Sequence, residues 1–344
     1  MSLYYARLSK HNFAPRVSFA YSPTKKGGTV VRGGAGFFFD RTGPAPIADL
    51  LHFNGVLLKR FIVENPAYPV TKPALAGLPT SVVMLDPRQR IPYAIQYSVS
   101  IEQQVNAKSS VSVSYVGSRG IDLFRSVDVN APVPPNYIAR PNPSLGQQRE
   151  LQSDGYQKSN ALEISFRGKP VNHLSGQAQY VLGKTYNNTS GITYFPANSH
   201  FPLFDWGRSD NDLRNKFDVL ATLDAGKWFN FGTALSTYSG KPVNVTTGND
   251  NNHDGMANDR PVGVPRNTLH GPTYINMDLN LAHDIRLMTS KEGGPIATIS
   301  VNSFNVLNHP NDVTYIGVVG SPFFGHAVTT LPARRMQLNL EVKF

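Results

Sequence analysis

Apolar and polar residues alternate along much of this chain with a period of two. The clearest example is the C-terminal run MQLNLEVKF (336–344), in which every second residue is apolar and Gln, Asn, Glu and Lys lie between. Successive side chains of a β-strand point to opposite faces, so this run predicts a strand with one apolar and one polar face.

The same period recurs in ten further runs. YAIQYSVSIEQQV (93–105) and SVSVSYVG (110–117) are separated only by a short turn, which predicts a hairpin. The remaining predicted strands are 16–22, 29–39, 160–168, 174–184, 215–224, 230–239, 273–284 and 297–307. Many of them approach the length of about ten residues that a tilted strand needs to cross a bilayer.

The connections between these strands alternate between short and long. The long ones are 40–92, 119–159, 185–214, 240–272 and 308–333. Outer-membrane barrels have short periplasmic turns, long extracellular loops, an apolar outer face and a polar lumen. The pattern therefore predicts an all-β, transmembrane antiparallel β-barrel with these five loops outside the cell. The alternative is a soluble β-sandwich or propeller, which usually lacks this asymmetry of loop length.

Composition excludes several classes of function. The chain has no cysteine, so it cannot form disulfides, thiolate zinc sites or a cysteine nucleophile. Its formal net charge is +10, but the Lys and Arg residues are scattered, so we expect no nucleic-acid partner. No apolar run approaches the roughly eighteen residues of a transmembrane helix, and the N-terminus lacks the pattern of a signal peptide.

No pattern indicates an enzyme. The nine histidines are dispersed without an HExxH motif, and Ser, His and Asp occur in no recognisable nucleophile context. The glycine-rich run GGTVVRGGAG (27–36) has the pattern of a strand and lacks the strand-turn-helix context of a phosphate loop. We therefore predict no catalytic residue and no cofactor-binding residue.

One loop matches the start of a calcium-binding pattern. In DNNHDGMAND (250–259), oxygen-bearing side chains occupy the first, third and fifth positions, and Gly255 occupies the sixth. The candidate ligands are Asp250, Asn252, Asp254, Asn258 and Asp259. The twelfth position is Pro261 instead of Glu, and no flanking helices are predicted. The alternative is therefore an Asn/Asp/Gly-rich extracellular turn that holds no metal.

A run of mixed charges, RSDNDLRNKFD (208–218), precedes one predicted strand. Its alternating Arg and Asp side chains predict either a network that contacts a substrate or a plug, or solvated loop charge at the strand entry. Asp218, Asp278 and Asn280 fall on the polar face of their strands, where they would contact a plug or line water.

Several irregular stretches resemble the C-terminal barrel of TonB-dependent outer-membrane receptors, specifically the Oar-like group. The matching stretches are 12–23, 30–41, 114–123, 208–218, 248–268, 303–311, 321–325 and the closing strand. They cover nearly the whole chain in a consistent order, which makes the resemblance more specific than any single motif.

The resemblance implies a barrel of about twenty-two strands, an N-terminal plug that fills it, and a segment that contacts the inner-membrane energy coupler. The chain resembles about the last eleven strands. Residues 1–344 are therefore expected to be the C-terminal part of one barrel domain, with the plug and N-terminal regions absent. Half a barrel leaves two unpaired strand edges in lipid, so we expect a fragment, a truncated product or half of a split receptor.

The implied function is uptake of a bulky ligand in the outer membrane of a Gram-negative cell, although this part alone is not expected to perform energised transport. The implied partners are outer-membrane lipid, the barrel-assembly machinery, the plug and a TonB-type energy coupler. The closing strand resembles a membrane-assembly signal, with Leu338, Leu340, Val342 and Phe344 as its residues. The alternatives are a structural or adhesive outer-membrane barrel without transport, and a soluble glycan-binding β-protein.

Overall fold

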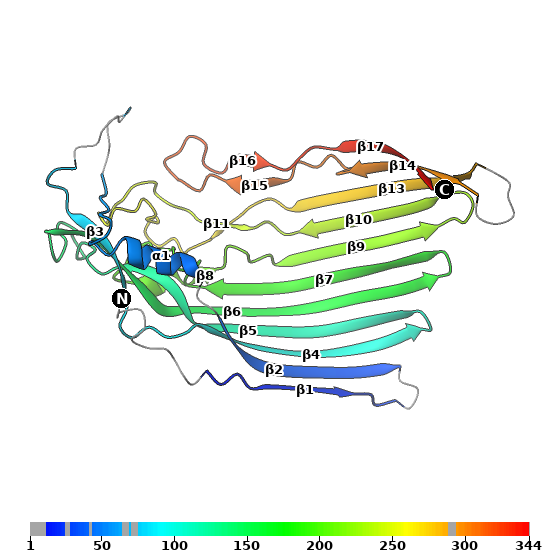
Figure 1. Cartoon of the computed structure of the whole chain (residues 1–344), viewed down its shortest axis with the longest axis horizontal. Coiled ribbons are helices and arrows are strands. Elements are labelled where there is room, and N and C mark those ends of the chain that lie inside the picture. Colours follow the sequence, from blue (N-terminus) through cyan, green and yellow to red (C-terminus); the bar gives the residue numbers. More distant parts are fainter. Residues whose placement is uncertain are drawn as a thin grey trace.

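One large antiparallel sheet dominates the protein (Figure 1). The computed structural model describes residues 12–24, 28–40, 43–63, 69, 75–287 and 294–343. The main path of the sheet has the order β1-β2-β4-β5-β6-β7-β9-β10-β13-β14-β17. Its strands follow chain order, so the sheet is an up-and-down meander. The predicted all-β fold class is confirmed, and the eleven strands of the path correspond to the eleven predicted runs.

The strands of the path are long. They are β1 (Arg16–Tyr21), β2 (Thr29–Phe39), β4 (Tyr93–Asn106), β5 (Ser109–Asp128), β6 (Leu145–Val171), β7 (Leu174–Asn187), β9 (Asn215–Asp224), β10 (Asn230–Tyr238), β13 (Tyr274–Arg286), β14 (Ile296–Phe304) and β17 (Arg335–Lys343). Short elements lie in the long connections between them. They are α1 (Pro44–His52), β3 (Thr80–Leu85), the 3-10 turn η1 (Pro202–Asp205), β8 (Gly207–Arg208), β11 (Pro242–Val243), β12 (Leu269–His270), β15 (Asp312–Tyr315) and β16 (Ala327–Thr330).

The strand register separates apolar and polar side chains onto two faces. Residues directly opposite each other on paired strands share a face. One row of such partners runs Val31, Ile101, Val113, Ile164 and Tyr180. The neighbouring row on the other face runs Glu102, Ser112, Ser165, Gln179 and Asp218. The period of two in the sequence therefore becomes one apolar and one polar surface across the whole sheet.

The two ends of the sheet differ, as Figure 1 shows. Short turns join the strands at the end that carries the C-terminus, which we call the short-turn end. The long connections with α1, β3 and β8 gather at the opposite end, which we call the long-loop end. Among the described residues, no helix is long and apolar enough to span a membrane.

The predicted loop 119–159 is shorter than expected. Strands β5 and β6 continue as a paired ladder as far as the pair Asp128 and Arg149, so only residues 129–144 connect them. Strand β3 joins β6 in parallel, with Val83 opposite Arg149. The sequence of this extension lacks a clean period of two because its side chains are buried on both faces.

The packed interior lies at the long-loop end. Most of the fully buried apolar side chains come from β3, the extensions of β5 and β6, and the long connections; they are Val83, Val127, Ala131, Leu151, Phe195, Ala197 and Val245. The sheet itself is a single layer, so its apolar face stays open to the surroundings. Fixed polar groups can therefore be held most rigidly at the long-loop end.

Candidate functional site

Six Arg–Asp pairs hold the long-loop end together, and we call them the cap network. They are Arg125–Asp154, Arg140–Asp128, Arg149–Asp49, Arg208–Asp212, Arg260–Asp205 and Arg266–Asp210. No arginine side chain among them is more than 17% exposed, whereas Asp49, Asp154 and Asp210 remain partly in contact with solvent. Two of the pairs, Arg260–Asp205 and Arg266–Asp210, join different connections, and Arg149–Asp49 ties α1 to β6.

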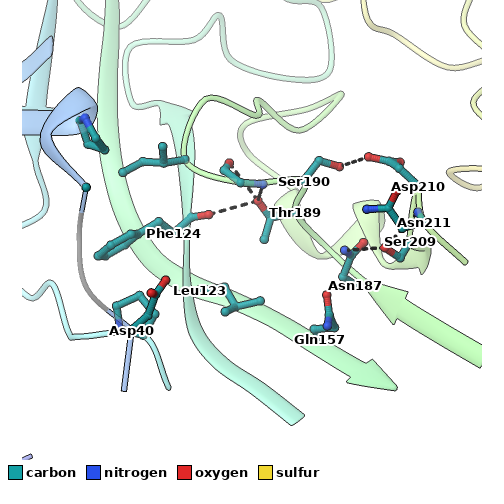
Figure 2. A pocket seen from close by; sticks show the side chains of 15 residues that line it. Asp40, Leu123, Phe124, Gln157, Asn187, Thr189, Ser190, Ser209, Asp210 and Asn211 are labelled. Carbon is teal, nitrogen blue, oxygen red and sulfur yellow. Dashed lines mark hydrogen bonds between the residues drawn. The ribbon is translucent and has the colours of Figure 1, made fainter. Parts of the chain in front are cut away.

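A cavity of about 440 Å³ opens beside the cap network (Figure 2). Its walls come from the end of β2, from β5 and β6, and from residues 187–192 and 209–211. Leu123 and Phe124 give it an apolar side, while Gln157, Asn187 and Asp210 give it polar groups. This mixture suits the binding of a polar ligand with some apolar surface.

Arg266 organises the polar wall of the cavity. Its guanidinium donates to Ser190 Oγ (2.6 Å), Asp210 Oδ1 (2.9 Å) and Asn187 Oδ1 (2.6 Å), and it lies over the ring of Tyr194. Partial burial by itself would raise the pKa of Asp210. The hydrogen bonds from Ser190 and Asn267, together with the Arg266 charge, outweigh it and lower that pKa below its ordinary value. Asp210 is therefore held as a carboxylate at the cavity wall.

Thr189 fixes the turn that forms the opposite part of the cavity wall. Its hydroxyl donates to the Phe124 carbonyl (3.2 Å) and accepts from the Gly191 N–H (3.1 Å). The neighbouring Asn188 side chain accepts from the Tyr156 N–H of β6 (2.7 Å). The wall is therefore anchored to β5 and β6. Its groups are hydrogen-bond donors and acceptors, and none of these contacts pairs a nucleophile with a base.

The five predicted calcium ligands lie together in the loop between β11 and β12. Asn252, Asp254 and Asp259 are buried there, whereas a simple exposed turn would leave them in water. Burial, with the like charges of Asp250 and Asp259, raises the pKa of Asp254 to about 7. No group of three or more His, Cys, Asp or Glu side chains in the described part of the chain could hold a metal ion. Any ion here would therefore need Asn oxygens as well.

Part of the mixed-charge run is buried, namely Arg208, Ser209 and Asp212. Arg208 Nε donates to Asp212 Oδ2 (2.7 Å), and the Asp212 side chain is 1% exposed. Asp212 Oδ1 also accepts from the Thr185 N–H (2.6 Å), which joins the run to β7. The interpretation as solvated loop charge is therefore wrong for Arg208 and Asp212. Their sequence spacing gave no indication that the long connections would fold over them.

The predicted lumen-facing residues lie on the polar face of the sheet. Asp218 accepts hydrogen bonds from Ser236 Oγ (2.6 Å) and Tyr238 Oη (2.7 Å). Asp278 accepts from the Asn305 N–H (2.8 Å), and Asn280 donates to Asn302 (2.6 Å). These groups are partnered within the sheet.

The predicted assembly signal lies on an edge strand. Leu338, Leu340 and Val342 project from one face of β17, on the side shared with Val301, Ile299 and Ala297 of β14. Leu338 is 73% exposed. Phe344 lies outside the described residues.

Sequence reasoning missed five of the six arginines of the cap network, all except Arg208, which lies in the mixed-charge run. Arg149 and its partner Asp49 are 100 positions apart, and Arg266 lies 56 positions from Asp210. The only available signal was the alternation of Arg and Asp in 208–218, which does not identify partners elsewhere in the chain.

Comparisons with known proteins agree with this architecture. Residues 3–265 match the family model described as "Outer membrane beta barrel domain". A comparison with curated proteins gives no match. Among solved structures, the outer membrane transporter YddB from Escherichia coli has 12% sequence identity and a TM-score of 0.63, over 96% of this chain and 40% of that chain.

Two structures from Pseudomonas aeruginosa are similar in fold as well. A variant of the ferric enterobactin receptor PfeA has 10% identity and a TM-score of 0.58, over 96% of this chain and 40% of that chain. The ferripyoverdine receptor has 11% identity and a TM-score of 0.54, over 94% and 32% respectively. The present chain therefore spans less than half the length of these proteins.

Proposed function

Because the chain belongs to the outer-membrane β-barrel domain family, we propose that it forms the barrel portion of a TonB-dependent transporter or receptor for a bulky ligand. One observation carries this proposal: an eleven-strand meander with one apolar and one polar face, whose long connections all gather at one end. That arrangement suits a wall between lipid and a wet lumen. The family is one of the Gram-negative outer membrane, and the chain is assigned to that membrane.

The proposal includes a place within a larger barrel. Receptor barrels of this kind have about twenty-two strands, and eleven strands make half of one. We propose that residues 1–344 are the C-terminal part of one barrel domain. Two points support this: the chain covers only part of the similar structures, and it resembles the Oar-like group. The plug and the energy coupler would then act with the complete barrel, and this part alone would not perform energised transport.

The long-loop end is the proposed outer, ligand-facing side. Long connections of outer-membrane barrels face the exterior. The cavity beside Asp210 and the rigid cap network lie at this end, so a ligand arriving from outside would meet them first. The cavity's polar lining supports a role in ligand contact, with the lumen-facing Asp218 and Asp278 deeper along the wall.

The closing strand β17 is proposed as the segment that the barrel-assembly machinery recognises. Leu338, Leu340 and Val342 share one face, which is proposed to contact lipid after insertion. A soluble glycan-binding protein would be expected to cover such a face, so the openness of this apolar surface argues against that alternative.

An uptake experiment tests the proposed transport. The gene is disrupted in its native host, and growth is measured with iron supplied as ferric enterobactin, as ferripyoverdine or as an iron salt. These chelates are chosen because the similar receptors are named for them. We expect disruption to reduce growth on at least one chelate and to leave growth on the iron salt unchanged. Complementation with the intact gene should restore growth on that chelate, and a protonophore should abolish the gene-dependent growth.

The competing function is a structural or adhesive outer-membrane barrel. This alternative predicts that disruption of the gene alters cell adhesion or envelope integrity. Growth on both chelates would then be the same with and without the gene, and the protonophore would not change that comparison. That result would exclude ferric siderophores as the ligand and favour the structural alternative.

A further inference from the structure

The loop of residues 250–259 is coiled tightly around its own oxygen atoms. The Asp250 carboxylate accepts from the N–H groups of Asp254 (3.0 Å) and Gly255 (2.8 Å), and Asn252 Oδ1 accepts from the same Asp254 N–H (3.1 Å). The backbone reverses through left-handed residues at His253 (φ 54) and Gly255 (φ 90). Side chains at alternate positions are therefore brought to one side of the coil.

Two buried side-chain oxygen atoms of this loop have no hydrogen-bond donor among the described residues. Asp254 is 1% exposed; its Oδ1 accepts from the Met256 N–H (2.9 Å), but its buried Oδ2 has no partner. The Asn258 side chain donates to the Phe195 carbonyl (3.1 Å), which leaves its buried Oδ1 without a partner. Buried acceptors without donors are costly, so each needs a cation, a proton or a water.

Other negative charge surrounds the unpartnered carboxylate oxygen. Asp250, Asp259 and, from the end of β5, Asp128 all lie near enough for their charges to raise the pKa of the Asp254 carboxyl. The Asp259 carboxylate is held across the coil by the N–H groups of Asn251 (2.7 Å) and Asn252 (3.2 Å). The candidate ligands of this loop are therefore carboxylate and amide oxygens, and among the described residues no three acidic side chains form a metal-holding group by themselves. His253 is exposed.

We propose that this loop binds one Ca²⁺ ion, with Asp254 Oδ2 and Asn258 Oδ1 as direct ligands, Asp250 as the second carboxylate and Asn252 as a further oxygen donor. Asp259 stays bound to the N–H groups of Asn251 and Asn252, in keeping with the absence of a three-acid metal group among the described residues. An ionised carboxylate has roughly four acceptor sites, so Asp250 can retain its N–H partners and still face an ion. Calcium accepts about 6–8 oxygens in flexible geometry, whereas Mg²⁺ requires a near-octahedral shell and sheds water reluctantly. The irregular, all-oxygen set therefore favours calcium.

A bound ion would connect three parts of the long-loop end. Asn252 Nδ2 donates to the Ala197 carbonyl (2.8 Å), and Asn258 contacts Phe195 in the same connection. Arg140, from the connection between β5 and β6, donates to the Asp254 carbonyl (2.9 Å). An ion held by Asp254 and Asn258 therefore fixes residues 129–144, 188–206 and 244–268 relative to one another. This role does not depend on transport.

Calorimetry of the refolded full chain in detergent tests the site, with CaCl₂ or MgCl₂ as titrant. We expect calcium binding with a Kd on the order of 10⁻⁴ to 10⁻³ M, as for extracellular calcium modules, and no comparable heat from magnesium. Asp254→Asn removes the central charge and is expected to weaken binding at least about tenfold, since affinity follows the ligand charge.

Asp224→Asn is the matched control. Asp224 also accepts a backbone N–H two residues further on, from Gly226 (2.8 Å), but it is exposed at the short-turn end and has no buried unpartnered oxygen. Its substitution is expected to leave the calcium affinity unchanged. Equal weakening by Asp224→Asn and Asp254→Asn would overturn the assignment.

Amide exchange of the unmodified chain gives a second readout that does not depend on a variant folding. Calcium, but not magnesium, is expected to slow exchange across residues 250–259 and at Arg140. If Asp254 is satisfied by a proton or a water, calcium will produce neither heat nor protection at concentrations up to about 5 mM, above the range of extracellular sites. That outcome would exclude the calcium site.

Discussion

At the scale of single residues, Arg266 shows how one buried side chain organises the candidate site. Its side chain is 1% exposed and bonds Asn187 at the end of β7 together with Ser190 and Asp210 of the connection that follows β7. A planar guanidinium can make several hydrogen bonds in fixed directions, so it positions these acceptors better than a flexible ammonium would. The shape of the cavity wall therefore depends on this one residue.

Replacing Arg266 with Met is expected to lower the free energy of unfolding by about 2–3 kcal/mol, because the buried Asn187 carbonyl and side-chain oxygens lose their charged donor. Urea titration of the refolded chain in detergent measures the change. The control is Arg88→Met, because the Arg88 side chain is 82% exposed and its contact with Asp86 is screened by water. Equal destabilisation by both substitutions would contradict the proposed role of Arg266.

Because Asp210 is held as a carboxylate, we expect the stability of the cavity wall to depend on acid pH. Its pKa is lower in the folded protein than the ordinary value of 3.8, so the folded state favours the carboxylate. This contribution to stability is complete above the ordinary pKa and is lost as pH falls through the folded pKa. Acidification through that window is therefore expected to lower the protection of the amides of residues 187–191 and 266–268, measured relative to the intrinsic exchange rate at each pH. In Asp210→Asn, this loss of protection should be absent; its persistence would assign the effect to another group.

At the scale of elements, β17 combines two environments in nine residues. Leu340 shares a face with Ile299, and Asn339 lies opposite Ser300 on the other face. Since the faces alternate at every residue, neighbouring positions report on the two sides of the same sheet.

Cysteine labelling can assign these two sides, since the chain has no cysteine of its own. We expect a water-soluble maleimide to label Asn339→Cys faster than Leu340→Cys in intact outer membranes, because lipid shields the apolar face. After solubilisation and unfolding, both variants should label equally. Equal rates in the membrane would contradict the assigned orientation.

The predicted assembly signal comprises Leu338, Leu340 and Val342 of β17 together with Phe344, which lies outside the described residues. Phe344→Ser is expected to reduce the amount of protein inserted in the outer membrane and to raise the amount left in the periplasm, as measured by fractionation. Lys343→Ser is the control, because Lys343 lies on the polar face of the strand. Normal insertion of the Phe344 variant would remove this residue from the signal.

At the scale of the whole molecule, the described sheet is open. Strand β1 pairs only with β2, and β17 pairs only with β14, within the residues that the structure describes. An unpaired strand edge in lipid leaves backbone groups without hydrogen bonds, each at a cost of several kcal/mol. The two edges therefore favour further pairing, with other strands of a receptor or with another copy.

The two unpaired edges of the described sheet predict that the isolated chain associates in detergent. Size-exclusion chromatography with light scattering should give a dimer or larger species, and replacing residues of β1 with proline should shift the distribution, since proline cannot donate to a ladder. Proline in the loop 129–144 is the control. A stable, heat-modifiable monomer would contradict the inference that both edges need partners.

The sequence by itself determined the strands, their two faces and the alternation of loop lengths. These features depend on residues that are neighbours in the chain or in a hairpin, where a period of two fixes which side each residue takes. The five candidate calcium ligands were also found from sequence, because their spacing is local. Their burial and the unpartnered oxygens were not predicted.

Only the tertiary structure decided how the long connections fold. The pairing of Arg149 with Asp49, the parallel contact of β3 with β6 and the contact of Arg208 with His270 join segments far apart in the chain. Such contacts follow no local period, and buried charges look in sequence like solvated ones. The strands of the barrel wall could therefore be predicted from the sequence, whereas the cap network and its cavity depend on packing between distant loops.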